Sequence, residues 1–182
     1  MSTFFTIGHS TRPLDAFVDL VQAARVELVA DVRTVPRSRT NPQYNKETLP
    51  EALKTFHISY RHFPALGGLR PKARDVAPKT NAFWRNASFH NFADYALSDA
   101  FHAGLVELRE AGARQRCVIM CAETLWWRCH RRIITDYLLN AGEDVFHILG
   151  PGQVEPATLT PALRAAASMT LVYPAAIADL FD

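Results

Sequence analysis

Short apolar runs alternate along the chain with longer segments in which apolar residues recur every three or four positions. Continuous short runs are typical of buried strands in a parallel sheet, and the spaced pattern is typical of amphipathic helices. One further segment, Ile58–Phe63, alternates with the two-residue period of a strand. These patterns predict strands at Thr3–Ile7, Leu28–Val32, Ile58–Phe63, Cys117–Cys121 and Val145–Leu149, the last in the chain.

Helices are predicted between these strands. Gly112 and Gly142 are predicted to end two of them, because glycine is common just beyond a helix. The aromatic-rich segment from Phe83 to Tyr95 is predicted to be helical in its second half. The other predicted helices are Pro13–Ala24, Lys46–Phe56, Ala100–Ala111 with Ser98 or Asp99 as its cap, Cys129–Asn140 and Ala175–Leu180. The alternation predicts the α/β class, a three-layer fold with a mainly parallel sheet flanked by helices.

Length and composition favour a single domain over residues 1–182. No apolar run reaches the roughly 20 residues that span a bilayer, and the first residues lack the basic region of a signal peptide. Three clustered cysteines do not resemble the disulfide framework of a secreted domain. We therefore expect a cytoplasmic protein with reduced thiols and no membrane partner.

The basic residues favour an anionic partner. The formal net charge is only +2, but sixteen of the twenty basic residues are arginine, whose guanidinium group matches phosphate and carboxylate geometry. The stretch from Asp31 to Arg74 holds nine basic residues and three acidic ones, which indicates nucleic acid or another phosphate-bearing ligand as a possible partner. An equally good explanation is that these basic residues lie in solvent-exposed loops and bind no ligand. The nine are Arg33, Arg37, Arg39, Lys46, Lys54, Arg61, Arg70, Lys72 and Arg74.

Polar or thiol side chains lie at the carboxyl end of every predicted strand. In a parallel sheet ligands bind outside these carboxyl ends, so the groups there are the first candidates for a site. They are His9 and Ser10, Asp31 and Arg33, Tyr60 to His62, Cys121 with Glu123, and His147.

Several of these segments together resemble a known family, the bacterial and archaeal domain of unknown function 488 family. The segments are Thr6–Ser10, Asp31–Arg33 with Pro36 and Ser38, Leu66–Gly68, the surroundings of Trp84, Cys121–Glu123 and Cys129–Arg131. The resemblance covers a family-like core of about residues 3–150 and leaves a C-terminal extension of about 151–182, which is expected to cap the sheet. It implies a compact α/β domain but does not indicate which reaction, if any, the domain catalyses.

Cys121 follows a buried strand and precedes a polar loop and a helix. Rhodanese-like sulfurtransferases and cysteine phosphatases use this placement to hold an anion with backbone N–H groups, and Asp31–Arg33 also resembles rhodaneses. Those enzymes have an arginine six positions after the cysteine, whereas here the first arginine, Arg128, follows Cys121 by seven. The alternative is that the cysteine is simply a small apolar side chain packed in the core. This explanation fits Cys121 at least as well as anion binding does, and it fits Cys117 better.

Cys129 and His130 lie at the start of a predicted helix, where the helix dipole would lower the pKa of the thiol. Cys121, Cys129 and His130 could ligate zinc, with His9 as a fourth ligand. The eight-residue step between the cysteines lacks the short pairing typical of structural zinc sites, so we assign no metal ligand and no cofactor at this point. A thiol redox sensor with a Cys121–Cys129 disulfide is a further alternative.

Two candidate proton carriers each have a simpler explanation. Glu123, near Arg128, Arg131 and Arg132, is either a general acid or base or the buried partner of an arginine. His9 is either a catalytic base or a hydrogen-bonded turn residue.

Other candidates would bind the substrate. Asp31 and Arg33, two positions apart in a strand, lie on the same face and can reach one pocket. Tyr44, Tyr60 and Trp84 could stack on a base, although core packing is the commoner use of such aromatics.

The leading hypothesis is an enzyme of unassigned reaction that acts on an anionic substrate, either nucleic acid or a nucleotide. Cys121 or Cys129 would be the nucleophile, Glu123 or His9 the proton carrier, and Arg33 with Arg131 the charge clamp. The predicted catalytic residues are Cys121, Glu123, Cys129, His130 and His9, and the predicted binding residues are Ser10, Asp31, Arg33, Tyr44, Tyr60 and Arg131. The alternative is a non-enzymatic nucleic-acid-binding or regulatory module with a structural thiol cluster.

Overall fold

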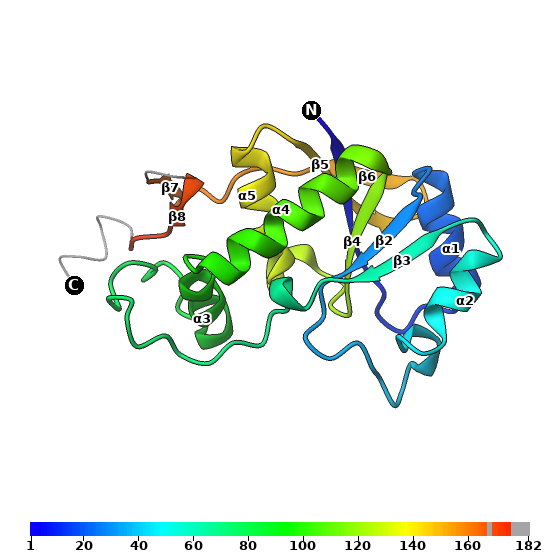
Figure 1. Ribbon diagram of the computed structural model, residues 1–182, viewed down its shortest axis with the longest axis horizontal. Helices are drawn as coiled ribbons and strands as arrows, with labels where there is room; N and C mark the ends of the chain where they lie inside the picture. The colour runs from blue at the N-terminus through cyan, green and yellow to red at the C-terminus, as the bar shows by residue number, and fades with distance from the viewer. Residues whose placement is uncertain (167–168, 176–182) are drawn as a thin grey trace.

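A six-stranded sheet forms the centre of the molecule (Figure 1). The structure is a computed structural model and describes residues 1–166 and 169–175. The strand order is β3-β2-β4-β1-β5-β6, in which β6 alone is antiparallel to its neighbour. The strands are β1 (Thr3–Gly8), β2 (Leu28–Asp31), β3 (Ser59–His62), β4 (Cys117–Cys121), β5 (Asp144–Gly150) and β6 (Gln153–Pro156). A separate pair consists of β7 (Arg164–Ala165) and β8 (Leu171–Val172).

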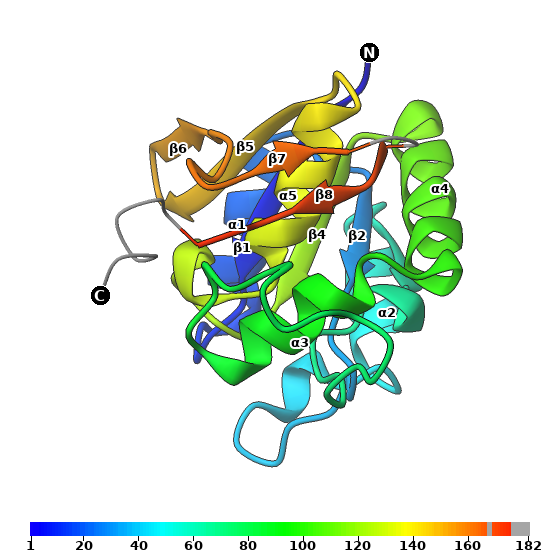
Figure 2. The same cartoon turned by 90° about the vertical axis from the view of Figure 1, so that its left-hand side faces the viewer.

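Helices cover both faces of the sheet, which confirms the predicted three-layer α/β fold (Figures 1 and 2). One face carries α1 (Leu14–Ala23) and α2 (Leu49–Lys54). The other carries α3 (Ala87–Tyr95), α4 (Asp99–Arg114) and α5 (Arg131–Asn140). Short 3-10 turns lie at η1 (Pro42–Tyr44), η2 (Pro64–Leu66) and η3 (Trp126–Arg128).

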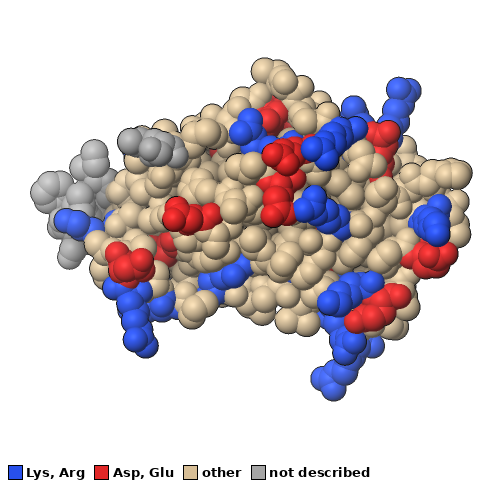
Figure 3. Space-filling view, viewed as in Figure 1, with Lys and Arg blue, Asp and Glu red and all other residues tan. Residues whose placement is uncertain are grey.

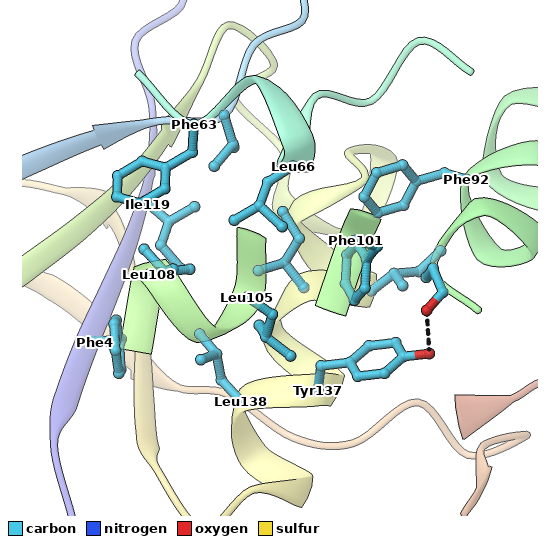
Figure 4. Packing of buried hydrophobic residues seen from close by; sticks show 14 of the residues in the cluster. Phe4, Phe63, Leu66, Phe92, Phe101, Leu105, Leu108, Ile119, Tyr137 and Leu138 are labelled. Carbon is cyan, nitrogen blue, oxygen red and sulfur yellow. Dashed lines mark hydrogen bonds between the residues drawn. The ribbon is translucent and has the colours of Figure 1, made fainter. Parts of the chain in front are cut away.

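Each central strand is buried on both faces, which explains its continuous apolar run. In β1, Phe4 packs toward α4 and α5, whereas Phe5 and Ile7 pack toward α1. Figure 4 shows the first of these two layers, where Phe101 and Tyr137 meet between helices. The Tyr137 hydroxyl donates a hydrogen bond of 3.0 Å to the Ala96 carbonyl, so this polar atom is satisfied inside the core.

Helices α2, α4 and α5 differ from their predicted bounds by two residues or more, and α5 begins at Arg131, two residues after the predicted start at Cys129. Helix α4 does not end at Gly112 but continues to Arg114, and Ser98 is its cap through a bond from Phe101 N. A Cβ at Gly112 would lie 2.2 Å from Phe4 Cζ, so the glycine permits close packing on β1 instead of ending the helix. Helix α2 is shorter than Lys46–Phe56 because turns occupy the ends of that range.

The C-terminal segment is part of the fold and not only a cover. The prediction that β5 is the last strand is wrong, because β6 extends the sheet at its edge. All four residues of β6 are exposed, so this strand has no apolar run in the sequence. Tyr173 is fully buried and donates to Asp136 Oδ2 at 2.9 Å.

The helix predicted at Ala175–Leu180 lies outside the described residues except for its first position. Among the helices of the described part, none has the length and apolar character needed to cross a membrane.

Candidate functional site

The chain after β1 and the chain after β4 form one side of the candidate site. These strands are neighbours, but α1 follows β1 on one face of the sheet and α5 follows β4 on the other. Such a switch point opens a crevice at the carboxyl ends of the strands. The two segments are held together there, because His9 N donates to the Cys121 carbonyl at 2.8 Å and Ser10 N donates to that of Ala122 at 3.0 Å.

Gly8 allows the segment after β4 to cross the end of β1. A Cβ at Gly8 would lie 2.0 Å from the Glu123 carbonyl oxygen and 2.6 Å from Thr124 Cα. Both are backbone atoms that no side-chain rotation can move away, so the crossing requires glycine at this position.

A buried ion pair anchors the loop after β2. Asp31 is completely buried, and its carboxylate accepts from Arg33 Nε at 2.9 Å, Arg33 Nη2 at 2.6 Å and the Tyr60 hydroxyl at 2.7 Å. Arg33 Nη2 also donates to the Tyr44 carbonyl at 2.6 Å. Because the carboxylate and guanidinium satisfy each other, Asp31 fixes the guanidinium of Arg33 at the edge of the sheet.

His9 is held in one tautomer. Its Nδ1 lies 2.8 Å from the Ser10 carbonyl, which can only accept, so Nδ1 donates and Nε2 accepts from Arg33 Nη1 at 3.2 Å. The ring also stacks on Tyr44 with a centroid distance of 4.1 Å. Burial lowers the pKa of His9 to about 4. Because both ring nitrogens are engaged, the geometry suits an orienting role for His9 better than proton transfer.

Cys121, Cys129 and His130 meet at the floor of the site, and we call them the thiol cluster. Their two sulfur atoms and one ring nitrogen lie within 4.8 Å of one another. Cys129 Sγ is 3.6 Å from His130 Nδ1, and His130 Nε2 is 3.0 Å from the Val32 carbonyl. Since that carbonyl can only accept, Nε2 carries a hydrogen and the lone pair of the neutral ring is on Nδ1, facing Cys129.

Arg131 lies next to the thiol cluster but does not line the cleft. It is 1% exposed, its Nε donates to Cys129 Sγ at 3.2 Å, and its Nη2 donates to the Glu123 carbonyl. Burial alone would raise the pKa of Cys129, but the hydrogen bond with Cys121 and the charge of Arg131 outweigh it and hold that pKa well below its usual value. The same hydrogen bond and burial raise the pKa of Cys121. Cys129 is therefore the thiol of the pair that ionises first.

A cleft of about 600 Å³ opens above the thiol cluster. Its walls come from the ends of β1 and β4, the light-blue segment after β2 at the bottom of Figure 1, residues 68–69 and the start of α3. Within the described part of the chain, three arginines line it (Arg33, Arg37 and Arg128) against one acidic residue, Glu123. Arginine therefore outnumbers acid in the lining, although Arg33 and Arg37 also pair with Asp31 and Glu47, which lie outside it.

The structure brings most of the predicted site residues together. His9, Ser10, Arg33, Cys121, Glu123, Cys129 and His130 line the cleft. Asp31, Tyr44 and Arg131 do not line it but contact residues that do. Tyr60 does not line it either, and its hydroxyl contacts Asp31, which holds Arg33. Trp84, the third aromatic candidate, is buried in the core.

Glu123 is not the buried partner of an arginine. The residue is exposed, and its carboxylate accepts from Leu125 N at 3.1 Å. Arg131 instead contacts the main-chain carbonyl of Glu123. The carboxylate therefore lies at the rim, where solvent can reach it.

Sequence reasoning missed several cleft residues. Gly68 packs against the imidazole of the thiol cluster, since a Cβ there would lie 2.5 Å from His130 Nδ1. The only signal in the sequence is a glycine pair in a long loop, within the family-like segment Leu66–Gly68. Ser88 and Phe89 line the cleft from α3, and no sequence pattern connected that helix with the strand ends.

Several residues of the basic stretch have acidic neighbours. Arg37 pairs with Glu47 at 2.9 Å, Arg61 pairs with Glu107, and Arg33 pairs with Asp31. Figure 3 shows basic and acidic side chains interspersed over the face in view. The stretch therefore forms no continuous basic patch on that face, and the nucleic-acid module gains no support from it.

His147 provides a prediction about stability. Its Nδ1 is 2.7 Å from Thr6 Oγ1, its ring stacks on Trp126 at 4.2 Å, and burial lowers its pKa to about 4. In the unfolded chain the His147 imidazole binds a proton near pH 6.5, whereas in the folded protein it does so only near pH 4. Acid therefore favours the unfolded state, and the unfolding free energy should fall by up to roughly 3 kcal/mol for this residue as the pH drops from about 6.5 to about 4. Urea unfolding at about pH 7.5 and about pH 5 should show a smaller acid loss in His147→Asn than in the wild type. Equal losses in the two proteins would contradict this.

Comparison with known proteins identifies a family. A family model described as Domain of unknown function DUF488 matches residues 13–138, more than half of the chain. The matched range includes Asp31, Arg33 and the whole thiol cluster. No curated protein and no solved structure matches the chain.

Proposed function

The chain belongs to the DUF488 family, and because the description of that family assigns no reaction, we propose a function from the cleft itself. The protein is an enzyme that binds an anionic substrate in the cleft and acts on it with the thiol cluster. The observation that carries the proposal is a cleft with the exposed arginines Arg37 and Arg128 in its lining and with two thiols and an imidazole at its floor.

The size and donors of the cleft suit a nucleotide or a short segment of nucleic acid. A volume of about 600 Å³ lies within the range of roughly 300–1,000 Å³ for small-molecule sites. Guanidinium groups bind phosphate in two-point contacts, and the lining adds hydroxyl donors at Ser10, Ser38 and Ser88. Val35 and Leu69, 61% and 69% exposed, offer apolar surface for a base or sugar.

Residues of the cleft divide into three roles in this proposal. The thiol cluster is the reactive centre, because sulfur and imidazole are the strongest nucleophiles and ligands at the floor. Arg33, fixed by Asp31 and His9, orients the anionic group. Glu123, exposed at the rim, is the group that exchanges protons with solvent.

A cytoplasmic setting belongs to the proposal. Cys117, Cys121 and Cys129 are all free, and the thiol cluster needs both of its sulfurs reduced.

Calorimetric titration at low salt with inorganic pyrophosphate, AMP and a short single-stranded oligonucleotide tests the proposal. Arg128→Gln should weaken binding of whichever of these binds by about tenfold, because a charge-assisted hydrogen bond is lost. Arg114→Gln is the matched control, since Arg114 is exposed at the end of α4, away from the cleft. Binding that both variants weaken equally, or no binding of any of the three ligands, would contradict the proposal.

A further inference from the structure

We propose that Cys121, Cys129 and His130 bind one zinc ion and leave its fourth coordination position open to the cleft. The inference deepens the proposed function, on which it rests only for the catalytic role of the metal. The binding of zinc itself depends on the thiol cluster alone.

The spacing of the ligand atoms fits tetrahedral zinc. Zinc lies about 2.3 Å from cysteine sulfur and about 2.0–2.1 Å from histidine nitrogen, so a tetrahedral site places sulfur and nitrogen about 3.5–3.6 Å apart. Cys129 Sγ and His130 Nδ1 are 3.6 Å apart. Cys121 Sγ completes a triangle in which all three atoms lie within 4.8 Å of one another. The three ligand atoms need to move only slightly closer together to coordinate the ion.

His130 is already oriented as a metal ligand. Histidines that ligate metals almost always donate their second ring N–H to a carbonyl or carboxylate, which fixes the tautomer. His130 Nε2 donates to the Val32 carbonyl at 3.0 Å, which leaves the lone pair on Nδ1 facing the sulfurs. Phe92 packs edge-on to the ring with a centroid distance of 4.9 Å, and Gly68 lies against it near Nδ1. The ring therefore has little freedom to turn away.

The charges around the thiol cluster suit two thiolates and a divalent ion. Two thiolates and one neutral imidazole cancel the charge of the metal. Arg131 Nε donates to Cys129 Sγ at 3.2 Å from the side away from the cleft, an outer contact that stabilises a sulfur ligand. Sulfur and nitrogen donors in a tetrahedral arrangement select zinc over magnesium or calcium.

The fourth coordination position faces the cleft and is not filled by His9. His9, the fourth ligand considered from the sequence, has both ring nitrogens engaged by Ser10 and Arg33. All three members of the thiol cluster line the cleft. Three protein ligands with an open position are the pattern of catalytic zinc, which polarises a substrate oxygen or a bound water. An anionic substrate oxygen fits that position next to Arg33.

Metal content and cobalt substitution test the inference. The purified full-length protein should contain one zinc per chain by elemental mass spectrometry. After removal of the zinc and addition of Co²⁺ alone, it should show thiolate-to-cobalt absorption and the visible bands of a tetrahedral site. Cys121→Ser, Cys129→Ser and His130→Asn should each lose these signals, whereas Cys117→Ala, which changes a thiol buried inside β4, should keep them.

Gly68→Ala probes the imidazole without removing a ligand. An alanine Cβ would lie 2.5 Å from His130 Nδ1, so the ring must shift and zinc affinity should fall by about 10–100-fold, as for outer contacts of metal ligands. Gly150→Ala is the control, because the nearest atom to its Cβ is 3.5 Å away.

The outcomes separate the inference from the proposed function. A folded protein without zinc and without the cobalt spectrum overturns the metal site, while anion binding that depends on Arg128 would still support the cleft enzyme. Zinc that the Cys121, Cys129 and His130 variants retain also overturns the site. Zinc bound as expected in a protein that binds none of the anions would overturn the proposed function and leave the metal site standing.

Discussion

Replacing Asp31 with alanine is expected to lower the unfolding free energy by about 3–5 kcal/mol, because the substitution leaves the buried guanidinium of Arg33 without its counter-charge. Asp31 is completely buried and Arg33 is 6% exposed. The variant removes the acceptor for two side-chain nitrogens of Arg33 and for the Tyr60 hydroxyl. Urea unfolding followed by circular dichroism measures the loss.

An exposed ion pair is the matched control. Arg61 and Glu107 also pair, but their side chains are 49% and 55% exposed. Glu107→Ala should therefore change stability by at most about 1 kcal/mol. If Asp31→Ala and Glu107→Ala cost the same, the Asp31–Arg33 pair does not anchor the edge of the sheet.

Gly8→Ala is expected to cost about 3 kcal/mol, the upper part of the usual range for overpacking, and to disturb the cleft. The new Cβ would lie 2.0 Å from the Glu123 carbonyl, so the segment after β4 must move away from β1. That segment follows Cys121 directly and contains the Glu123 carbonyl that Arg131 holds, so anion and zinc binding should weaken together with stability.

Gly150→Ala provides the comparison, since its Cβ meets nothing closer than Gln153 Oε1 at 3.5 Å. It should change stability by no more than about 0.5 kcal/mol. A Gly8→Ala protein as stable as Gly150→Ala, with an unaltered affinity for anions, would show that the crossing of the two segments does not shape the site.

The central strands and the edge that carries the site could be predicted from the sequence. Strands buried on both faces are mostly apolar, so β1 and β4 appear as short apolar runs, and the polar groups at their ends mark the carboxyl edge. The convergence of His9, Arg33 and Cys121 on one cleft follows from the parallel arrangement of their strands.

Contacts between distant side chains could not be predicted in this way. Nothing in the local pattern distinguishes Arg131, which lies behind the thiol cluster, from Arg128, which lines the cleft. Gly112 looks like a helix end in the sequence, and only the packing of α4 on Phe4 reveals its role. β6 could not be predicted from an apolar run, because all of its residues are exposed at the edge of the sheet and none needs to be apolar.

The most direct test of the central claim, that an anionic ligand binds above the thiol cluster, is the alkylation rate of each cysteine. Iodoacetamide is added to the metal-free protein, and mass spectrometry follows the three sites separately. Cys121, which is partly exposed, and Cys129, which is 4% exposed but lines the cleft and ionises first, should react, while the fully buried Cys117 stays unmodified. The anion that binds in titration should slow both reactions in the wild type but less in Arg128→Gln. A bound anion that leaves the rates at Cys121 and Cys129 unchanged would contradict the claim.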